Sequence, residues 1–289
     1  CLVATSGDTG SAVAQGFFDV EGIKVTLLYP KGKVSKIQEQ QLTTIGQNIT
    51  ALEVDGTFDD CQLLVKTAFL DRELNEKLNL SSANSINIAR LLPQSFYYIY
   101  VFSRLGRTKG DVYFCVPSGN FGNLCGGLLA KKMGLPISGF IAASNANDIV
   151  PHYLETGLFE PKPSVQTIAN AMDVGNPSNF VRLLELYGND FAKITDDIKG
   201  ISFDDAHTKA LIREVHGKYG YLMCPHTAIG YGGLQHYLKP GDTGVFLSTA
   251  HPCKFKDVVE PLISESIEIP LRLKAIIEKK KHAISMSKD

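Results

Sequence analysis

Stretches of consecutive apolar residues alternate with helix-like segments along most of this chain, and this alternation constrains the fold more than any other feature. The apolar stretches, which are typical of buried strands, lie at 23–29, 49–54, 111–116, 137–143 and 244–248. Helix-like segments separate them or follow them, at 35–46, from 57 onward, and at 124–133, 204–219 and 227–237. Apolar strands that alternate with helices predict an α/β fold whose parallel sheets are covered on both faces.

Local signals mark where several of these helices begin and end. Ser35 is followed three residues later by Gln38, which is the spacing of a capping box. Gly46 suits the left-handed turn that ends a helix. Thr57 precedes two aspartates, so its hydroxyl can cap a helix whose positive end the acids favour.

Composition excludes several classes of protein. The chain has 289 residues, which corresponds to about two domains. Hydrophobic residues make up 44% of it, enough for a full core, so wholesale disorder is excluded. The balanced net charge of −1 argues against a nucleic-acid binder. No apolar run approaches the ~20 residues needed to cross a bilayer, so we predict no membrane segment.

The six cysteines are typical of a protein in a reducing compartment. None of them forms a C-x-x-C pair, so the sequence supports neither a zinc ribbon nor a redox motif, and we predict no metal site. Most stand among apolar residues, which favours buried thiols and a cytoplasmic location.

Two glycine-rich loops follow predicted strands. The loop 118–123 contains two glycines, and the loop 6–11 combines glycines with three hydroxyl side chains. Glycine lets the backbone approach an anion, and the N–H groups at a helix start can bind one without a cation. The 118–123 loop matches neither the dinucleotide fingerprint nor the P-loop, which favours a small phosphorylated ligand over a nucleotide. For the 6–11 loop, a simple capped helix start is an equally good interpretation.

Two further segments contain candidate binding groups. The segment 84–90 brings two asparagines, a serine and an arginine together. If Asn87 starts a helix, Arg90 lies one turn on, where its guanidinium can grip a phosphate; the alternative is a capped helix with a surface salt bridge. The loop 248–252 follows the last predicted strand and presents Thr249 and His251. A structural turn is the favoured interpretation of His251.

The order and wording of these four segments resemble the threonine synthases, which are pyridoxal-phosphate enzymes of fold type II. The resemblance extends from Ala4–Gly10 to His251–Phe255 and includes the segment 170–179, for which the residues alone indicate no role. It implies two parallel-sheet α/β domains of the tryptophan synthase β-like kind, incomplete at the N-terminus. It also implies pyridoxal 5′-phosphate as the cofactor.

The resemblance assigns roles residue by residue. It implies that the cofactor phosphate is held by a loop formed by Gly119, Asn120, Phe121, Gly122 and Asn123. Thr249 resembles the residue that faces the pyridine nitrogen. Two groups resemble the residues that bind the substrate, at its carboxylate and at its phosphate respectively: Ser6, Gly7, Asp8 and Thr9, and Asn84, Ser85 and Arg90.

Two features depart from the family pattern. Many relatives have Asn where Asp8 stands, and an acid there would repel the substrate carboxylate unless backbone donors intervene or Asp8 turns away. The Schiff-base lysine of the family stands in a Phe-Lys-Asp context upstream of the 6–9 loop, and this sequence starts at Cys1, just after that point. Phe255–Asp257 repeats the wording on the wrong side of every other motif, so we interpret Lys256 as an exposed helix residue.

The resemblance therefore implies that no catalytic lysine is present here. We expect the sequence to be the C-terminal part of a longer protein and to be inactive by itself. We expect residues 1–88 to form a smaller, mobile α/β domain that binds substrate. Residues 89–289 would form the larger cofactor-bearing domain, completed by an upstream segment. The charge run 278–282 predicts a solvated helix end and tail.

The activity that the resemblance implies converts O-phospho-L-homoserine and water to L-threonine and phosphate. The expected partner is thus a small-molecule substrate, with no nucleic acid and no membrane, and the oligomeric state stays open. Three alternatives remain at this point: a related phospho-lyase that releases a 2-keto acid, a non-catalytic ligand-binding domain, and a sheet protein whose glycine loops only cap helices.

Overall fold

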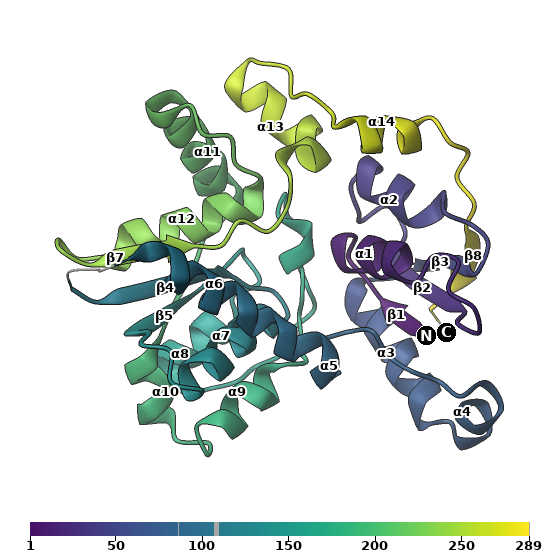
Figure 1. The fold of residues 1–289 in the computed structure, drawn as a ribbon, viewed down its shortest axis with the longest axis horizontal. Helices are drawn as coiled ribbons and strands as arrows, with labels where there is room; N and C mark the ends of the chain where they lie inside the picture. Colours follow the sequence, from purple (N-terminus) through teal and green to yellow (C-terminus); the bar gives the residue numbers. More distant parts are fainter. Residues whose placement is uncertain (86, 107–109, 289) are drawn as a thin grey trace. The chain divides into compact units, whose positions relative to one another are not determined.

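The computed structural model describes residues 1–85, 87–106 and 110–288, and the chain divides into two compact units (Figure 1). Unit 1 comprises Cys1–Asn84, Cys253–Lys256 and Ser266–Asp289. Unit 2 comprises Ser85–Pro252 and Asp257–Glu265. The C-terminal residues therefore belong to the same unit as the N-terminal ones.

Unit 1 is built on a parallel sheet in the order β1-β2-β3-β8. Its strands are β1 (Leu2–Ala4), β2 (Val25–Pro30), β3 (Ile49–Asp55) and β8 (Ile284–Ser287). Its helices are α1 (Asp8–Gly16), α2 (Lys36–Thr43), α3 (Phe58–Leu70), α4 (Arg72–Leu78) and α14 (Leu271–Ile277). Successive side chains of a strand point to opposite faces. Leu27 accordingly packs in a core with Val13 of α1, and Leu28 packs in another with Val65 of α3.

Unit 2 is built on a second parallel sheet in the order β6-β5-β4-β7. Its strands are β4 (Val112–Pro117), β5 (Gly139–Ser144), β6 (Ile198–Ser202) and β7 (Thr243–Phe246). The helices up to the middle of the unit are α5 (Ile88–Leu91), α6 (Ser95–Leu105), α7 (Gly122–Lys132) and α8 (Ile149–Thr156). The later ones are α9 (Phe180–Leu186), α10 (Phe191–Asp197), α11 (Asp205–Tyr219), α12 (Pro225–Tyr237) and α13 (Lys256–Ile263). Short 3₁₀ turns lie at Leu92–Gln94 and Asn170–Met172, and a third, Pro252–Phe255, leads from this unit into the residues 253–256 of unit 1.

Helices cover both faces of the second sheet (Figure 1). On one face, Phe114 of β4 packs in a core with Leu124 of α7 and Tyr98 of α6. On the other face, Cys115 packs in a core with Ile229 of α12. Neighbouring residues of one strand thus supply two different cores, which confirms the predicted α/β fold with doubly covered parallel sheets.

Both helix starts that the sequence marks are present. Ser35 accepts a hydrogen bond from the backbone N–H of Gln38, whose side chain accepts one from the N–H of Ser35 in return. Thr57 and Asp60 form the same reciprocal box at the start of α3. Gly46 adopts the left-handed conformation expected of it, with φ of 72°.

The structure differs from the sequence expectations at the C-terminal end. The strand expected to be buried at 244–248 is β7, which is only half-buried because it lies at an edge of its sheet. The expected tail contains β8, which pairs with β3, so residues 266–289 belong to unit 1 rather than to the larger domain. The change of unit falls after Asn84, whereas the expected boundary followed residue 88. Lys256 begins α13 and is half-buried, not exposed. Among the described helices, none combines the length and the apolar character that a membrane crossing requires.

Candidate functional site

The loop between β4 and α7 contains two glycines, Gly119 and Gly122, at which a side chain would clash with neighbouring residues. A Cβ added to Gly119 would lie 2.6 Å from the Cα of Met172 and 2.8 Å from the carbonyl oxygen of Ala171. A Cβ on Gly122 would lie 2.9 Å from the Cβ of Ser85. Between them, Phe121 takes a left-handed conformation with φ of 59°, which is unusual for a large side chain and typical of functional loops.

This loop leaves the start of α7 as a set of backbone donors. Phe121 occupies the N-cap position, and no side chain of the described residues caps the helix there. The first N–H groups of a helix have no partner within it, and its dipole favours an anion at that end. Asn123 is held in place because the Tyr98 hydroxyl, 2.6 Å away, donates to its Oδ1. The loop therefore fits a phosphate group bound through backbone N–H groups.

The segment 167–179 wraps around this loop and fixes it. The backbone N–H of Ser178 donates to Oδ1 of Asn120 at 2.6 Å. The side-chain nitrogen of Asn179 donates to the carbonyl of Asn120 at 2.9 Å and to the hydroxyl oxygen of Ser85 at 2.8 Å. The segment 170–179, whose role the sequence left open, is thus the structural support of the glycine loop.

The carboxylate of Asp173 holds that segment in place through hydrogen bonds. It accepts them from the amides of Asn145 and Asn147 and from the backbone N–H and hydroxyl of Thr167. Burial raises the pKa of Asp173 to about 6, although these donors favour the ionised form. A second anchor lies nearby in the chain, where the N–H of Ala171 donates to Nε2 of the buried His226 at 3.1 Å.

The loop after β7 and the glycine loop after β4 both follow the carboxyl ends of their strands. Because β7 pairs in parallel with β4, these two ends lie on the same side of the sheet. Ser248 and Thr249 are exposed there. The Ser248 hydroxyl lies 3.4 Å from that of Thr227, which in turn lies 3.2 Å from the sulfur of Cys224. Burial alone would raise the pKa of the Cys224 thiol, but hydrogen bonds from His226 and Thr227 hold it below its ordinary value.

The loop between β1 and α1 carries the second set of candidate donors, in unit 1. The hydroxyl of Thr5 accepts from the N–H groups of Gly7 and Gly10, at 3.0 and 2.8 Å. Gly7 has φ of 132°, a conformation that favours glycine. The carboxylate of Asp8 pairs with Nζ of Lys254 at 2.6 Å, and both side chains are largely shielded from solvent. The charge of Asp8 is therefore paired within unit 1, whereas the neighbouring Thr9 is exposed.

The structure separates the residues of the segment 84–90. Asn84 uses both ends of its amide on the backbone N–H and carbonyl of Ala4, so it ties the segment to β1 in unit 1. Asn87 caps α5 through the N–H of Ala89, as the sequence predicts, and Arg90 follows one turn later in unit 2. Burial lowers the pKa of the half-buried Arg90 guanidinium. Ser85 belongs to unit 2 and lies against the start of α7.

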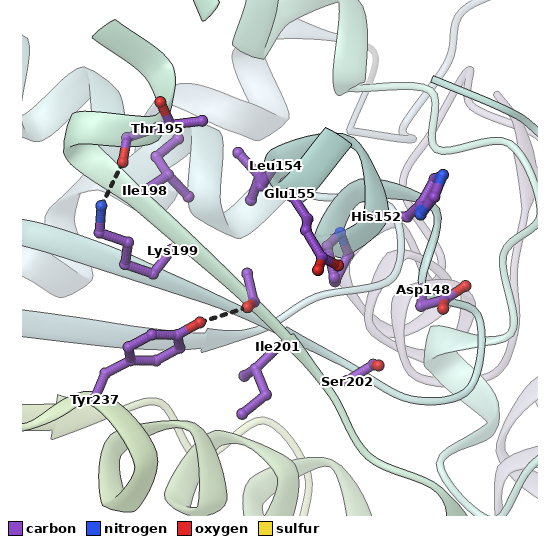
Figure 2. A pocket seen from close by; sticks show the side chains of 12 residues that line it. Asp148, His152, Leu154, Glu155, Thr195, Ile198, Lys199, Ile201, Ser202 and Tyr237 are labelled. Atoms are coloured by element: carbon purple, nitrogen blue, oxygen red, sulfur yellow. Dashed lines mark hydrogen bonds between the residues drawn. The ribbon is translucent and has the colours of Figure 1, made fainter. Parts of the chain in front are cut away.

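A cavity of about 500 Å³ lies beside the edge strand β6 and contains none of the predicted site residues (Figure 2). Two of its polar groups are already bonded to backbone carbonyls: Nζ of Lys199 to Thr195 at 2.6 Å, and the hydroxyl of Tyr237 to Gly200 at 2.8 Å. None of the residues that line the cavity belongs to the glycine loop or to α7.

Comparison with known proteins agrees with this geometry. Residues 1–250 match the family model described as pyridoxal-phosphate dependent enzyme, and residues 227–289 match the one described as threonine synthase, C-terminal. The chain belongs to the pyridoxal-phosphate-dependent enzymes, and within them to the threonine synthases. This membership confirms both the predicted family and the predicted cofactor class. The cradle of Gly119, Gly122 and the start of α7 fits the phosphate of that cofactor.

Individual family members resemble the chain closely. A threonine synthase of Buchnera aphidicola from Schizaphis graminum is 49% identical over 277 residues, which cover 94% of this chain and 63% of the relative. The crystal structure of threonine synthase from Escherichia coli superposes with a TM-score of 0.96 at 45% identity, covering 100% of this chain and 67% of that one. A pyridoxal-phosphate-bound threonine synthase from Brucella melitensis has a TM-score of 0.87 at 36% identity, covering 100% and 68%. The chain thus spans about 63% of the length of the Buchnera relative.

The predicted site residues fall into two groups in this family member. The predicted cofactor residues 119–123 and Thr249 follow the carboxyl ends of the paired strands β4 and β7 in unit 2, with Ser85 beside Gly122. Ser6 to Thr9 and Asn84 lie in unit 1. Sequence reasoning missed Lys254, Asp173 and the contacts of Asn179. The only signal for the last two was their place in a segment rich in asparagine that resembles the family.

Proposed function

We propose that this chain is the part of a threonine synthase that binds the cofactor phosphate and the substrate, in an enzyme that converts O-phospho-L-homoserine and water to L-threonine and phosphate in threonine biosynthesis. In this proposal unit 1 is the smaller, mobile substrate-binding domain and unit 2 the cofactor-bearing domain. Six free cysteines, five of them buried, support a cytoplasmic location.

The observation that supports this function most strongly is the arrangement at the start of α7. The reaction involves two phosphate groups, one on the cofactor and one on the substrate. The glycine loop offers backbone donors for one phosphate, and Ser85, with the cationic Arg90 on the adjoining α5, offers side-chain donors for the other. Arginine suits a phosphate because its planar fork can donate two parallel hydrogen bonds.

Each group of residues has a separate role in the proposed reaction. When bound, the cofactor supplies an electron sink that stabilises negative charge on the amino-acid carbons. Thr249 offers a neutral hydroxyl to the ring nitrogen, and the start of α1 offers N–H groups to the substrate carboxylate. Ser85 and Arg90 hold the phosphate that departs when the Cγ–O bond breaks. Water then adds its oxygen at Cβ, and Cγ gains a proton, which gives threonine and inorganic phosphate.

The ion pair between Asp8 and Lys254 reduces the repulsion between Asp8 and the substrate carboxylate that the start of α1 is proposed to bind. In the cofactor-loaded enzyme, Lys254→Met leaves Asp8 charged beside the substrate carboxylate, so we expect KM for O-phospho-L-homoserine to rise about 10-fold with little change in kcat. Adding Asp8→Asn should bring KM back to within about 3-fold of the wild-type value. Steady-state kinetics measure both. A double variant no better than Lys254→Met alone would contradict this role.

The family's lysine is expected outside these residues. Borohydride reduction of the cofactor-loaded enzyme, followed by peptide mapping, should label a lysine that lies in none of the peptides from residues 1–289. The 289 residues produced alone should form no threonine. Labelling of Lys256, or of any other lysine of this chain, would show that the assignment is wrong.

Product analysis tests the proposed function itself. The cofactor-loaded enzyme should release L-threonine and phosphate from O-phospho-L-homoserine in equal amounts. A 2-keto acid in place of threonine would make the protein a phospho-lyase instead. Ligand binding without any product would make it a non-catalytic binding protein.

A further inference from the structure

The side chain of Asn179 is unusual in two respects. The residue stands at the N-cap position of α9, where an asparagine normally accepts a hydrogen bond from the helix, yet no side-chain cap is formed there among the described residues. Its side chain is fully buried, and its Oδ1 finds no hydrogen-bond partner within the described part of the chain. A buried polar atom left in this way is costly and requires a reason.

The reason lies in the hydrogen bonds that the side-chain nitrogen of Asn179 donates. The carbonyl oxygen of Asn120 can only accept, so the group that faces it at 2.9 Å must be the Nδ2 of Asn179. The same nitrogen lies 2.8 Å from the hydroxyl oxygen of Ser85. Because Nδ2 is a donor, Ser85 must act there as an acceptor. The hydroxyl hydrogen of Ser85 is then directed to another acceptor.

The position of Asn179 is itself rigid. Its backbone carbonyl oxygen accepts hydrogen bonds from the N–H groups of Arg182 and Leu183 in the first turn of α9, each at 3.1 Å. The same oxygen lies 3.7 Å from the sulfur of Cys125 in α7. Ser85 in turn adjoins Gly122 at the start of α7. Asn179 therefore connects the glycine loop and the Ser85 hydroxyl through its side chain, and α7 and α9 through its backbone carbonyl.

We propose that Asn179 is a positioning residue that fixes Ser85 as a hydrogen-bond donor to the substrate's phosphate and ties that donor to the cofactor-phosphate loop. This inference rests on the proposed function, because it takes the anion beside Ser85 to be the phosphate of the substrate. It assigns a role in phosphate recognition to a residue that touches neither phosphate itself.

Equilibrium binding to the cofactor-loaded enzyme tests the role without depending on turnover. The probes are inorganic phosphate and L-threonine, which lacks a phosphate, both titrated by calorimetry. Asn179→Ala should weaken phosphate binding about 10-fold and leave L-threonine binding within about 3-fold of the wild type. Ser85→Ala should weaken phosphate binding similarly. The double variant should be no weaker than Asn179→Ala alone, since both changes remove the same donor.

Two further variants separate positioning from folding. Asn48→Ala removes a comparable structural amide, whose Nδ2 donates to the carbonyls of Phe17 and Ile23 in unit 1. It should lower the unfolding midpoint and leave phosphate affinity unchanged. Asn179→Asp keeps the size of the side chain but replaces the donor with an acceptor, so it should weaken phosphate binding even if Asn179→Ala fails to fold.

The outcomes are distinct from those of the functional test. Unchanged phosphate affinity in both Asn179 variants, equal loss of phosphate and threonine binding, or additive effects of the Ser85 and Asn179 changes would each overturn the positioning role. If the wild type forms no threonine but shows the predicted pattern of binding, the proposed function fails while the role of Asn179 in holding an anion stands.

Discussion

Gly119→Ala is expected to abolish retention of the cofactor. The new Cβ would lie 2.6 Å from the Cα of Met172 and 2.8 Å from the carbonyl of Ala171, and both of these are backbone atoms that no rotamer change can move. Such overpacking costs on the order of 3 kcal/mol or displaces the loop. A misplacement of roughly 1 Å can cost an enzyme on the order of 100-fold in function, and here the displaced groups are the backbone donors proposed to hold the cofactor phosphate. Titration of pyridoxal phosphate against the apoenzyme, followed by absorbance, measures the loss.

Gly217→Ala is the matched control for that experiment. Gly217 lies inside α11, and, apart from its chain neighbours and the nearby backbone of its own helix, no atom of the described residues lies within 4 Å of the position that its Cβ would take. Alanine is favoured over glycine within a helix by about 0.5–1 kcal/mol, so this variant should be slightly more stable with unchanged cofactor affinity. Cofactor affinity in Gly119→Ala equal to that of Gly217→Ala would contradict the assignment of the glycine loop.

Lys281→Met is expected to destabilise unit 1 by removing a cation shared between two carboxylates. Nζ of Lys281 pairs with Glu53, whose side chain is only 9% exposed, and with Glu39 at 2.7 Å. The buried Tyr29 donates to Glu53 at 3.2 Å, and Ser285 of β8 donates to it as well. Removing this cation would leave the neighbouring carboxylates of Glu39 and Glu53 without the ion pair that the described residues give them. Because Lys281 is partly exposed, we expect a cost of about 2 kcal/mol, less than for a fully buried pair.

The pH dependence of this loss identifies its cause. The hydrogen bond from Lys281 holds the pKa of Glu53 below its ordinary value, against the effect of burial. A lowered carboxyl pKa stabilises the fold above the pKa of the unfolded state, and that stability is lost as pH falls through the folded value. The difference between wild type and Lys281→Met should therefore be full at pH 7 and shrink below about pH 4. Denaturant unfolding at several pH values measures it.

The exposed neighbour Lys280 provides the control, because the two lysines have the same chemistry and differ in burial. Lys280→Met should change the free energy of unfolding by less than about 0.5 kcal/mol at any pH. If the two variants behaved alike, the C-terminal charge run would be a solvated tail after all.

Local patterns in the sequence predicted those features whose partners lie close together in the chain. The capping boxes at Ser35 and Thr57 need residues only three positions apart, and the glycine loop is a single strand-to-helix turn. The alternation of apolar strands and helices determined the sheet type for the same reason. Family resemblance then supplied the predicted roles of these loops.

Ion pairs across the sequence could not be predicted in this way. Lys254 meets Asp8 over a separation of 246 residues, and Lys281 meets Glu53 over 228. No periodicity encodes such a pair, because the return of the C-terminal residues to unit 1 is a property of the folded chain. Asn179 was missed for a related reason, since an asparagine before a helix normally indicates only a cap.

The oxygen atoms of the two products provide the most direct test of the claim that this site serves threonine synthesis. The enzyme would be incubated with O-phospho-L-homoserine in water enriched in ¹⁸O, and both products analysed by mass spectrometry. In the proposed reaction the Cγ–O bond breaks and water adds at Cβ, so we predict one ¹⁸O in the hydroxyl group of threonine and none in the phosphate released at early times. Label in the released phosphate, or threonine without label, would contradict the account.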